Sequence, residues 1–287
     1  MTAITLDGEL LAAEVRDDLS TRIAVLAERD VVPGLGTILV GDDGPSHNYV
    51  AMKHRDSEAL GMHSREAVLG ADAAQAEIEA VVDDFNADPA VHAYIIQYPF
   101  PAGLDYEAAL MRVLPEKDAD GLHPVNLGRL VQGVDAPVAC TPSGIQMLLE
   151  RFDVPIAGQH VVIVGRGLTI GRPLANLLSL KRPNANAAVT VVHTGVPDIG
   201  RLTRQADILV AAAGSPGMIT ADMVKPGAAV VAAGVSFQGK KLISDVADEV
   251  AEVAGWLSPR IGGVGPMTRA LLMANTVAAA ERAAGVV

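Results

Sequence analysis

The chain has almost no cysteine, since Cys140 is the only one among 287 residues. One thiol cannot form a disulfide within the chain, which excludes a disulfide-stapled secreted scaffold and favours a reducing compartment. No stretch approaches the roughly 20 apolar residues that span a bilayer. The amino terminus also lacks the cationic start and apolar run of a signal peptide. These absences predict a cytoplasmic protein with no membrane partner.

Basic residues are also scarce, with 22 Lys and Arg against 34 Asp and Glu, so the formal net charge is −12. This balance does not suit general binding to nucleic acid or to anionic membranes, although one local Arg can still hold a phosphate. The seven His residues are scattered, and neither H-E-x-x-H nor C-x-x-C occurs. We therefore expect no nucleic-acid partner and no metal site.

Aromatic residues make up only 3% of the chain, so the core must be built from Ala, Val, Leu and Ile. Short β-branched or apolar runs, which read as buried strands, alternate with helical patterns, most regularly after residue 158. This alternation predicts an α/β fold with a doubly wound parallel sheet. The predicted strands are 37–41, 93–97, 160–165, 187–193, 207–214 and 228–234. The predicted helices are 9–29, 46–60 with Ser46 as N-cap, 73–86, 106–113, 142–152, 170–180, 197–205 and 268–285.

A length of 287 residues accommodates two such domains with a cleft between them. We predict a first α/β domain over residues 1–140 and a second, Rossmann-type domain over residues 141–267. The last helix, 268–287, is expected to pack back on the first domain.

The clearest local motif follows the predicted strand 160–165, where Gly165, Gly167 and Gly171 form a G-x-G-x-x-x-G spacing before a helix. Glycines permit a tight turn and a close approach of backbone N–H groups to phosphate, and the helix N-terminus favours negative charge. The alternative is an ordinary glycine-rich β-α turn. With the alternation that follows, the motif predicts a dinucleotide site.

The coenzyme preference can be argued from two positions. NAD enzymes usually carry an acidic residue at the end of the second strand, which binds the ribose hydroxyl. Here that strand ends in Val192-His193-Thr194, and Arg166 lies inside the glycine loop, where a guanidinium can pair with a 2′-phosphate. Both positions favour NADP, although Arg166 could instead be a solvent-exposed cation.

Further candidates are individually weak. Tyr49 and Lys53 lie four residues apart, on one face of a predicted helix. A lysine can exchange protons if burial lowers its pKa, but spacing alone fits a surface lysine equally well. Gln97 ends a strand, 117–121 is an acidic loop, and 262–268 is a glycine-rich run. These could be a strand cap, a turn and a connector.

Taken together, these blocks resemble the bifunctional methylenetetrahydrofolate dehydrogenase/cyclohydrolase family over essentially the whole chain. The matching blocks are S-x-x-Y-x-x-x-K, IIQYPFP, PEKDADGLHPVNLGRL, CTPSG, GRGLTIGRPLANLL, VTVVHTG, ADILVAAAG and GGVGPMTRALLMANT. They occur in the family's order and spacing. The GRG form of the glycine loop looks like the actinobacterial branch.

The resemblance implies NADP-dependent oxidation of 5,10-methylenetetrahydrofolate and hydrolysis of the methenyl product to 10-formyltetrahydrofolate, a one-carbon donor for purine biosynthesis. It makes the first domain the folate-binding and catalytic one, and it suggests a homodimer. Lys53 would be the central acid/base, Gln97 would tune it, Tyr49 would orient the pterin and Asp120 would bind the pterin nitrogens. The folate site would be shaped by Gly262, Gly263, Pro266 and Thr268. The NADP site would comprise Thr141, Gly165, Arg166, Gly167, Thr169, Ile170, Gly171, His193, Thr194, Ala213, Gly214 and Val235.

Two positions depart from the family pattern. The fourth strand of the coenzyme domain usually ends in Asp-x-Gly, whereas this chain has Ala232-Ala233-Gly234, and Ile261 replaces a proline before the folate loop. Three alternatives follow: a dehydrogenase with weak or absent cyclohydrolase activity, a coenzyme-binding homologue with impaired catalysis, or a different two-domain NADP dehydrogenase such as one acting on shikimate. The last would not explain Tyr49, Lys53, Gln97 and Asp120.

Overall fold

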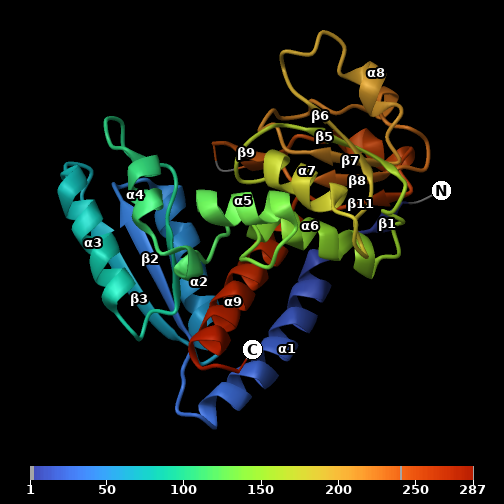
Figure 1. The fold of residues 1–287 in the computed structure, drawn as a ribbon. Helices are drawn as coiled ribbons and strands as arrows, with labels where there is room; N and C mark the ends of the chain where they lie inside the picture. The colour runs from blue at the N-terminus through green and yellow to red at the C-terminus, as the bar shows by residue number, and fades with distance from the viewer. Residues whose placement is uncertain (1–2, 240, 287) are drawn as a thin grey trace. The chain divides into compact units, whose positions relative to one another are not determined.

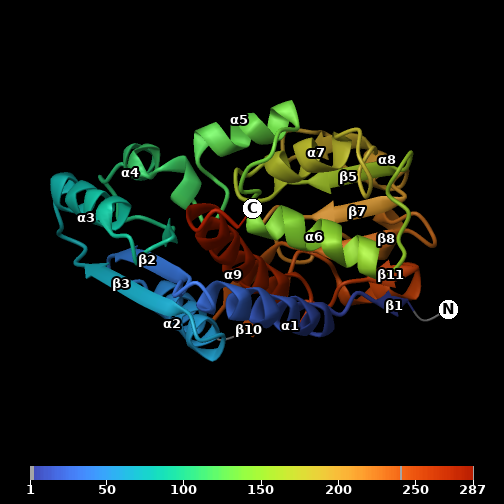
Figure 2. The same ribbon diagram turned by 60° about the horizontal axis from the view of Figure 1, so that its bottom comes forward.

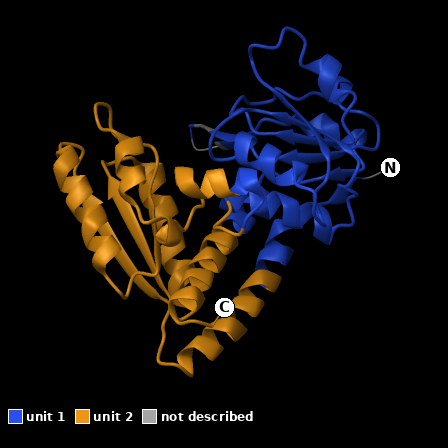
Figure 3. Ribbon diagram, in the orientation of Figure 1, with its two compact units in different colours: residues 1–13, 130–134, 139–268 blue, residues 14–129, 135–138, 269–287 orange. Residues whose placement is uncertain are grey.

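The computed structural model describes residues 3–239 and 241–286, and the chain divides into two compact units (Figure 3). Unit 1 comprises residues 1–13, 130–134 and 139–268, and unit 2 comprises residues 14–129, 135–138 and 269–287. Among the described residues, no helix combines the length and apolar character needed to cross a membrane.

Unit 1 is built on a six-stranded parallel sheet with the order β1-β11-β8-β7-β5-β6 (Figure 1). Its central strands are apolar and wholly buried, as expected where helices and loops cover both faces of a parallel sheet. The strands are β1 (Ile4–Thr5), β5 (His160–Val164), β6 (Ala188–Val192), β7 (Ile208–Ala211), β8 (Ala229–Ala232) and β11 (Trp256–Leu257), with a separate hairpin of β9 (Val235–Gln238) and β10 (Lys241–Ser244). The helices are α6 (Cys140–Arg151), α7 (Gly171–Ser179), α8 (Gly200–Thr203), η2 (Ala221–Met223) and η3 (Asp248–Glu252).

The doubly wound parallel sheet predicted from the alternation is confirmed, but four details differ from the expectation. Strand β1 pairs with β11 at the sheet edge, and neither strand was predicted. The hairpin β9–β10 was also not predicted. The predicted helix 197–205 is only the single turn of α8, because Pro197 and Asp198 precede it in a loop.

Unit 2 contains a three-stranded parallel sheet with the order β3-β2-β4. On one face, Ile38 of β2 packs with Ile78 and Val82 of α3. On the other, Thr37 Oγ1 lies 2.8 Å from Nε2 of His54 in α2. Consecutive strand residues point to opposite faces, so the two helices cover the two faces of the sheet. The strands are β2 (Gly34–Val40), β3 (His63–Leu69) and β4 (Ala93–Ile96). The helices are α1 (Gly8–Ala27), which begins in unit 1, α2 (Gly44–Ala59), α3 (Gln75–Ala87), α4 (Tyr106–Arg112), η1 (Pro115–Lys117), α5 (Pro124–Gln132) and α9 (Val264–Ala283).

The prediction of Ser46 as the N-cap of α2 is wrong. The helix begins two residues earlier, and Asp43 is its N-cap. A carboxylate oxygen of Asp43 accepts hydrogen bonds from the backbone N–H and the hydroxyl of Ser46, at 2.9 and 2.6 Å. An acidic cap beside the positive end of the helix stabilises this end, which sets the register of the residues that follow.

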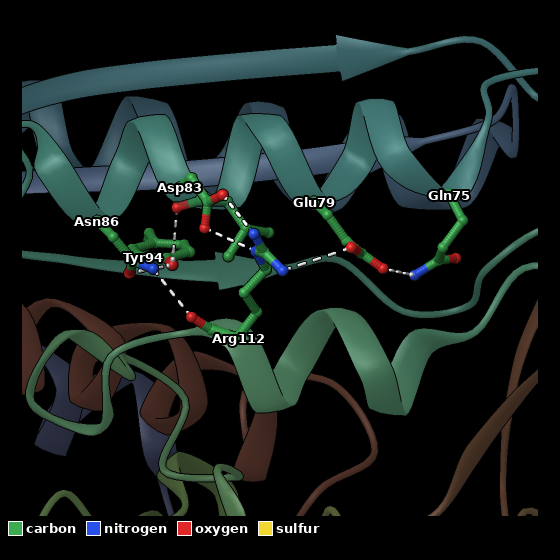
Figure 4. Close-up of polar contacts among 7 residues, drawn as sticks. Gln75, Glu79, Asp83, Asn86, Tyr94 and Arg112 are labelled. Carbon is green, nitrogen blue, oxygen red and sulfur yellow. Dashed lines mark hydrogen bonds and ion pairs between the residues drawn. The ribbon is translucent and has the colours of Figure 1, made fainter.

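Helices α3 and α4 are joined by the Arg112 side chain (Figure 4). Its Nε and Nη2 atoms donate to the two carboxylate oxygens of Asp83 at 2.7 and 2.6 Å. The side chain of Asn86 donates to the Arg112 carbonyl at 2.9 Å and accepts from the hydroxyl of Tyr94 at 2.7 Å. Because Tyr94 belongs to β4, this network holds the strand that leads into the candidate site.

Helices α1 and α9 lie side by side in unit 2 (Figures 1 and 2). Arg22 donates to both carboxylate oxygens of Glu281, through Nε at 2.9 Å and through Nη2 at 2.6 Å. The bond to Glu281 raises the pKa of Arg22. Such a two-pronged pair fixes orientation as well as distance, so α9 has a defined register against α1.

Candidate active site

The side chains of Lys53 and Gln97 meet in unit 2. Lys53 lies in the third turn of α2, and its Nζ atom donates to Oε1 of Gln97 at 2.9 Å. Both side chains are partly buried, so the amine is neither free in solvent nor enclosed in the core. Tyr49 lies one turn earlier on the same helix and is 39% exposed. The helical spacing predicted for Tyr49 and Lys53 is thus present.

The amide of Gln97 is held in a defined orientation. Its backbone N–H donates to the Ile38 carbonyl at 2.8 Å, which extends the pairing of β4 with β2. Its Nε2 donates to the carbonyl of Tyr98 at 2.7 Å. With Nε2 committed there, Oε1 is turned toward Lys53 as an acceptor. The next peptide bond, Tyr98–Pro99, is cis.

Asp120 lies in a loop that is fixed on both sides. The buried carboxylate of Asp118 accepts from the backbone N–H groups of Gly121 and His123, at 3.0 and 2.8 Å. Asn275 of α9 donates to the carbonyl of Ala119 at 2.9 Å. Asp120 is itself partly buried. Asp118 was not singled out from the sequence, although it belongs to the same acidic motif, because its role depends on backbone groups that only the folded loop brings together.

An aromatic cluster connects the Asp120 loop with the turn after Gln97. The ring of Tyr106 packs edge-on against Tyr98 and Phe100, with centroid distances of 5.4 and 5.2 Å. Burial raises the pKa of Tyr106, and the negative charges of Asp120 and Asp118 raise it further. Tyr106 therefore stays protonated at neutral pH and keeps a hydroxyl donor near these carboxylates.

The glycine loop of unit 1 has no room for side chains at two of its positions. A Cβ on Gly165 would lie 2.1 Å from the Ala212 carbonyl oxygen, and the φ of Gly165 is +129°. A Cβ on Gly171 would lie 2.1 Å from the carbonyl oxygen of Gly165. Arg166, Gly167 and Thr169 are exposed between them, just before the N-terminus of α7. This backbone cradle fits the phosphates of a dinucleotide.

The other residues predicted for the coenzyme site also lie in unit 1. His193 follows β6, and its Nδ1 accepts from the Gly195 N–H at 3.0 Å, which turns the ring over the loop that holds Thr194. Ala213 and Gly214 follow β7, and Val235 begins the hairpin after β8. The carboxyl ends of adjacent parallel strands share one edge of a sheet, so these loops lie along the edge that carries Gly165.

The second glycine run is pinned by the start of α1. The backbone N–H groups of Gly8 and Glu9 donate to the Gly262 carbonyl at 2.7 and 3.2 Å. A Cβ on Gly8 would lie 1.7 Å from the carbonyl oxygen of Gly263, so only glycine fits there. Pro266 is buried. Within unit 1, the hydroxyls of Thr141 and Thr268 lie 2.9 Å apart. Gly8 carried no signal in the sequence, because its partner lies more than 250 positions away.

The two departures from the family pattern have different surroundings. Ala232 is 5% exposed, and its N–H donates to the hydroxyl of Ser258 at 2.8 Å, so the backbone at this strand end has a partner. Ile261 is 70% exposed and precedes Gly262, whose φ is +80°. Ile261 therefore leaves a flexible approach where a proline would restrict φ.

The predicted catalytic residues Tyr49, Lys53, Gln97 and Asp120 all belong to unit 2. The structure shows direct contact only for Lys53 and Gln97 among these four. The predicted coenzyme residues and the residues 262, 263, 266 and 268 all belong to unit 1. A Rossmann-like sheet with a glycine cradle, together with a lysine-glutamine pair in a second α/β unit, defines the class of two-domain dinucleotide-dependent oxidoreductases.

Comparison with known proteins narrows this class. Residues 6–120 match the family described as the tetrahydrofolate dehydrogenase/cyclohydrolase catalytic domain, and residues 139–284 match its NAD(P)-binding domain. The bifunctional protein FolD of Syntrophotalea carbinolica is 55% identical over 99% of this chain and 98% of its own. The crystal structure of the bifunctional FolD enzyme from Campylobacter jejuni has a TM-score of 0.94 at 35% identity, covering 98% of this chain and 99% of that one. FolD of Trypanosoma brucei, solved with NADP and an inhibitor, has a TM-score of 0.93 at 36% identity, covering 99% of both chains.

The chain belongs to the tetrahydrofolate dehydrogenase/cyclohydrolase family. It is an NADP-dependent methylenetetrahydrofolate dehydrogenase and methenyltetrahydrofolate cyclohydrolase. The resemblance inferred from the sequence motifs is thereby confirmed, and the shikimate alternative is excluded.

Proposed function

We propose that Lys53 is the acid/base group of both reactions and that Gln97 holds its amine in place. The observation that carries this assignment is the 2.9 Å hydrogen bond from Lys53 Nζ to Gln97 Oε1. Gln97 is oriented in turn by its bond to the Tyr98 carbonyl. An amine positioned by an uncharged acceptor can exchange protons without being locked in its charged form by a carboxylate.

The hydrolytic half follows from this arrangement. A water oxygen attacks the methenyl carbon while Lys53 accepts one water proton. The remaining hydroxyl proton passes to N5 as the bond between N5 and that carbon breaks, which leaves 10-formyltetrahydrofolate. The attack requires a neutral amine, since an ammonium has no lone pair and would repel the cationic substrate.

The substrate is proposed to bind in contact with Tyr49 and Asp120. The exposed ring of Tyr49 offers a surface for the pterin, and the carboxylate of Asp120 offers acceptors for its ring N–H groups. The rigid backbone around Asp120, held by Asp118, supports this role because a fixed acceptor selects one orientation. The loop residues Gly262, Gly263, Pro266 and Thr268 are proposed to complete the folate site.

The coenzyme is proposed to bind along the carboxyl edge of the unit 1 sheet. When bound, NADP supplies the two-electron oxidant for the methylene carbon. Arg166, exposed in the glycine loop, is the proposed partner of the 2′-phosphate, with His193 and Thr194 nearby in place of the acid of NAD enzymes. The remaining proposed contacts are Thr141, Gly165, Gly167, Thr169, Ile170, Gly171, Ala213, Gly214 and Val235.

The family resemblance supports four broader proposals. Residues 1–140 together with the helix 268–287 serve as the catalytic and folate-binding domain, and residues 141–267 serve as the NADP domain. The protein acts as a homodimer in the cytoplasm. Its product, a formyl donor, supplies purine biosynthesis. Sedimentation equilibrium on the purified protein tests the dimer, because a monomer mass at micromolar concentration would contradict it.

A spectroscopic assay tests the catalytic proposal. The protein is mixed with methylenetetrahydrofolate and NADP or NAD, and the absorbances of the reduced coenzyme and of the methenyl product are followed. Lys53→Met should slow hydrolysis at least ~100-fold while folate still binds. The matched control Lys181→Met, at an exposed lysine, should keep both rates. Hydrolysis at the normal rate in Lys53→Met would remove Lys53 as the base. In the unmodified protein, methenyl product that decays only at its uncatalysed rate would favour the dehydrogenase with weak or absent cyclohydrolase activity.

A further inference from the structure

A buried carboxylate, Asp245, holds the loop that follows β7. Asp245 comes directly after β10 and is 1% exposed. Its Oδ2 accepts from the backbone N–H groups of Ala213 and Gly214, at 2.7 and 2.8 Å. Hydrogen bonds to a carboxylate are about twice as strong as neutral ones, so this oxygen fixes two consecutive peptide groups.

The same carboxylate also packs against the end of β8. A Cβ on Gly234 would lie 1.9 Å from Oδ2 of Asp245, so no side chain fits there while the carboxylate keeps its place. The Asp245 N–H donates to the Gly234 carbonyl at 3.0 Å, and the Gly234 N–H donates to the Ala211 carbonyl at 2.7 Å. Asp245 therefore connects the carboxyl ends of two neighbouring strands.

These strand ends lie beside the point where the direction of the chain crossover reverses. Strand β5 lies between β6 and β7, so the connection from β5 to β6 leaves on one side and the chain returns to β7 on the other. Open α/β sheets bind ligands at this kind of position, outside the carboxyl ends of the strands. Ala212, next to the held loop, is the residue whose carbonyl excludes a Cβ from Gly165. The loop after β7 thus touches the glycine cradle directly.

The second oxygen of Asp245 has an unusual environment. Oδ1 is buried and has no hydrogen-bond partner within residues 3–239 and 241–286. Burying a carboxylate oxygen without a donor costs stability, so a purely structural position would favour a smaller or neutral side chain. Retention of a carboxylate here is explained if its other oxygen does something that a neutral group does less well.

We propose that Asp245 is a positioning residue for coenzyme binding: by accepting both N–H groups of the Ala213–Gly214 loop, it sets the loop in the conformation that faces the glycine cradle. This inference rests on the proposed NADP site at the same edge. Asp245 touches the loop backbone and not the reacting atoms, so it controls coenzyme affinity and leaves the lysine chemistry of unit 2 unchanged.

Binding measurements separate this role from a general loss of stability. The affinity for NADP, measured by isothermal titration calorimetry, should fall at least ~10-fold in Asp245→Ala and no more than ~3-fold in Asp245→Asn, because an asparagine oxygen can still accept both bonds. Asp248→Asn is the matched control, since the Asp248 side chain is 97% exposed and lies three positions further on. Equal affinities in Asp245→Ala and the unmodified protein would overturn the inference, and so would equal losses in the alanine and asparagine variants. If the unmodified protein itself bound no NADP, the proposed coenzyme site would fail instead.

A double-mutant cycle provides the sharpest readout. Gly234→Ala should weaken NADP binding about as much as Asp245→Ala, because the new Cβ displaces the carboxylate. In the Asp245→Ala background the same substitution should add less than ~2-fold, since the obstructing oxygen is gone. Additive losses would overturn the inference. Should Asp245→Ala fail to fold, amide hydrogen exchange in Asp245→Asn gives a second test. Faster exchange should be confined to residues 213 and 214, and unchanged exchange at both amides would contradict the proposal.

Discussion

The Nζ atom of Lys53 lies 2.9 Å from Oε1 of Gln97, which joins the third turn of α2 to the end of β4. The two residues are 44 positions apart, and each is held by its own backbone contacts. The amine is thus presented at a set place without a charged partner among the contacts described above. This relationship yields the first prediction.

Gln97→Ala should lower the turnover number of both reactions about 10–100-fold, because the amine loses the acceptor that orients it. The affinity for NADP should not change. Gln97→Glu should shift the rising limb of the pH–rate profile to higher pH, since a negative neighbour favours the protonated lysine. Gln75→Ala on α3 is the control and should keep both rates. An unaltered pH profile in Gln97→Glu would show that Gln97 does not influence Lys53.

Arg166→Ala should weaken NADP binding at least ~10-fold and NAD binding less than ~3-fold, because only NADP carries the phosphate that a guanidinium can pair with. Titration calorimetry with both coenzymes measures the two affinities. Arg201→Ala removes an exposed charge from the same unit and serves as the control. Equal weakening for NAD and NADP would argue against a phosphate contact.

Gly165→Ala should destabilise the protein by about 3 kcal/mol or more, because the new Cβ meets a backbone carbonyl and the residue has a positive φ. Gly167→Ala should leave the unfolding midpoint within about 1 °C, since the nearest atom to its Cβ would be 3.9 Å away. Thermal unfolding followed by circular dichroism compares the two variants. A similar midpoint for both would mean that the Gly165 turn can adjust without cost.

His92 should make unit 2 less stable in acid. Burial lowers the pKa of His92, and the positive charges of Lys117 and His63 lower it further. Its Nδ1 accepts from the Gly34 N–H at 3.0 Å, a bond that protonation would break. The folded state therefore binds fewer protons, so stability falls as the pH drops below the unfolded histidine pKa of about 6.5.

The variant His92→Asn, whose side-chain oxygen can still accept from Gly34, should reduce the fall in unfolding midpoint between pH 7 and pH 5 by roughly 2 °C. The control His47→Asn removes a partly exposed histidine of the same unit. If His92→Asn and the unmodified protein lose stability in parallel, His92 does not contribute to the acid sensitivity.

Much of the architecture was predictable, and the misses have physical causes. Strands β5, β7 and β8 were predicted because burial on both faces demands continuous apolar residues. Strand β3 was missed because it is an edge strand, and His63, Arg65 and Glu66 break the apolar run. Two-residue strands such as β1 carry no periodicity at all.

The site divides in a similar way. The glycine loop was predicted from its position between a strand and a helix. The proximity of Lys53 and Gln97 came only from the family resemblance, since spacing along the chain does not show that α2 and β4 meet. Asp118 and Asp245 were not predicted, because each acts on backbone N–H groups and any exposed acid looks the same in a sequence.

The pairing of β1 with β11 also bears on how the protein folds during synthesis. Ile4 aligns with Trp256, so the first strand to leave the ribosome must wait for nearly the whole chain before its partner exists. Contacts between such distant positions form late and slow the folding of a sheet. Until then, the last-formed edge of the sheet in unit 1 is open and Gly262 lacks the N–H donors of Gly8 and Glu9. A nascent chain stalled before residue 256 would therefore expose an unpaired strand edge, and folate-loop competence would be among the last properties that the protein acquires.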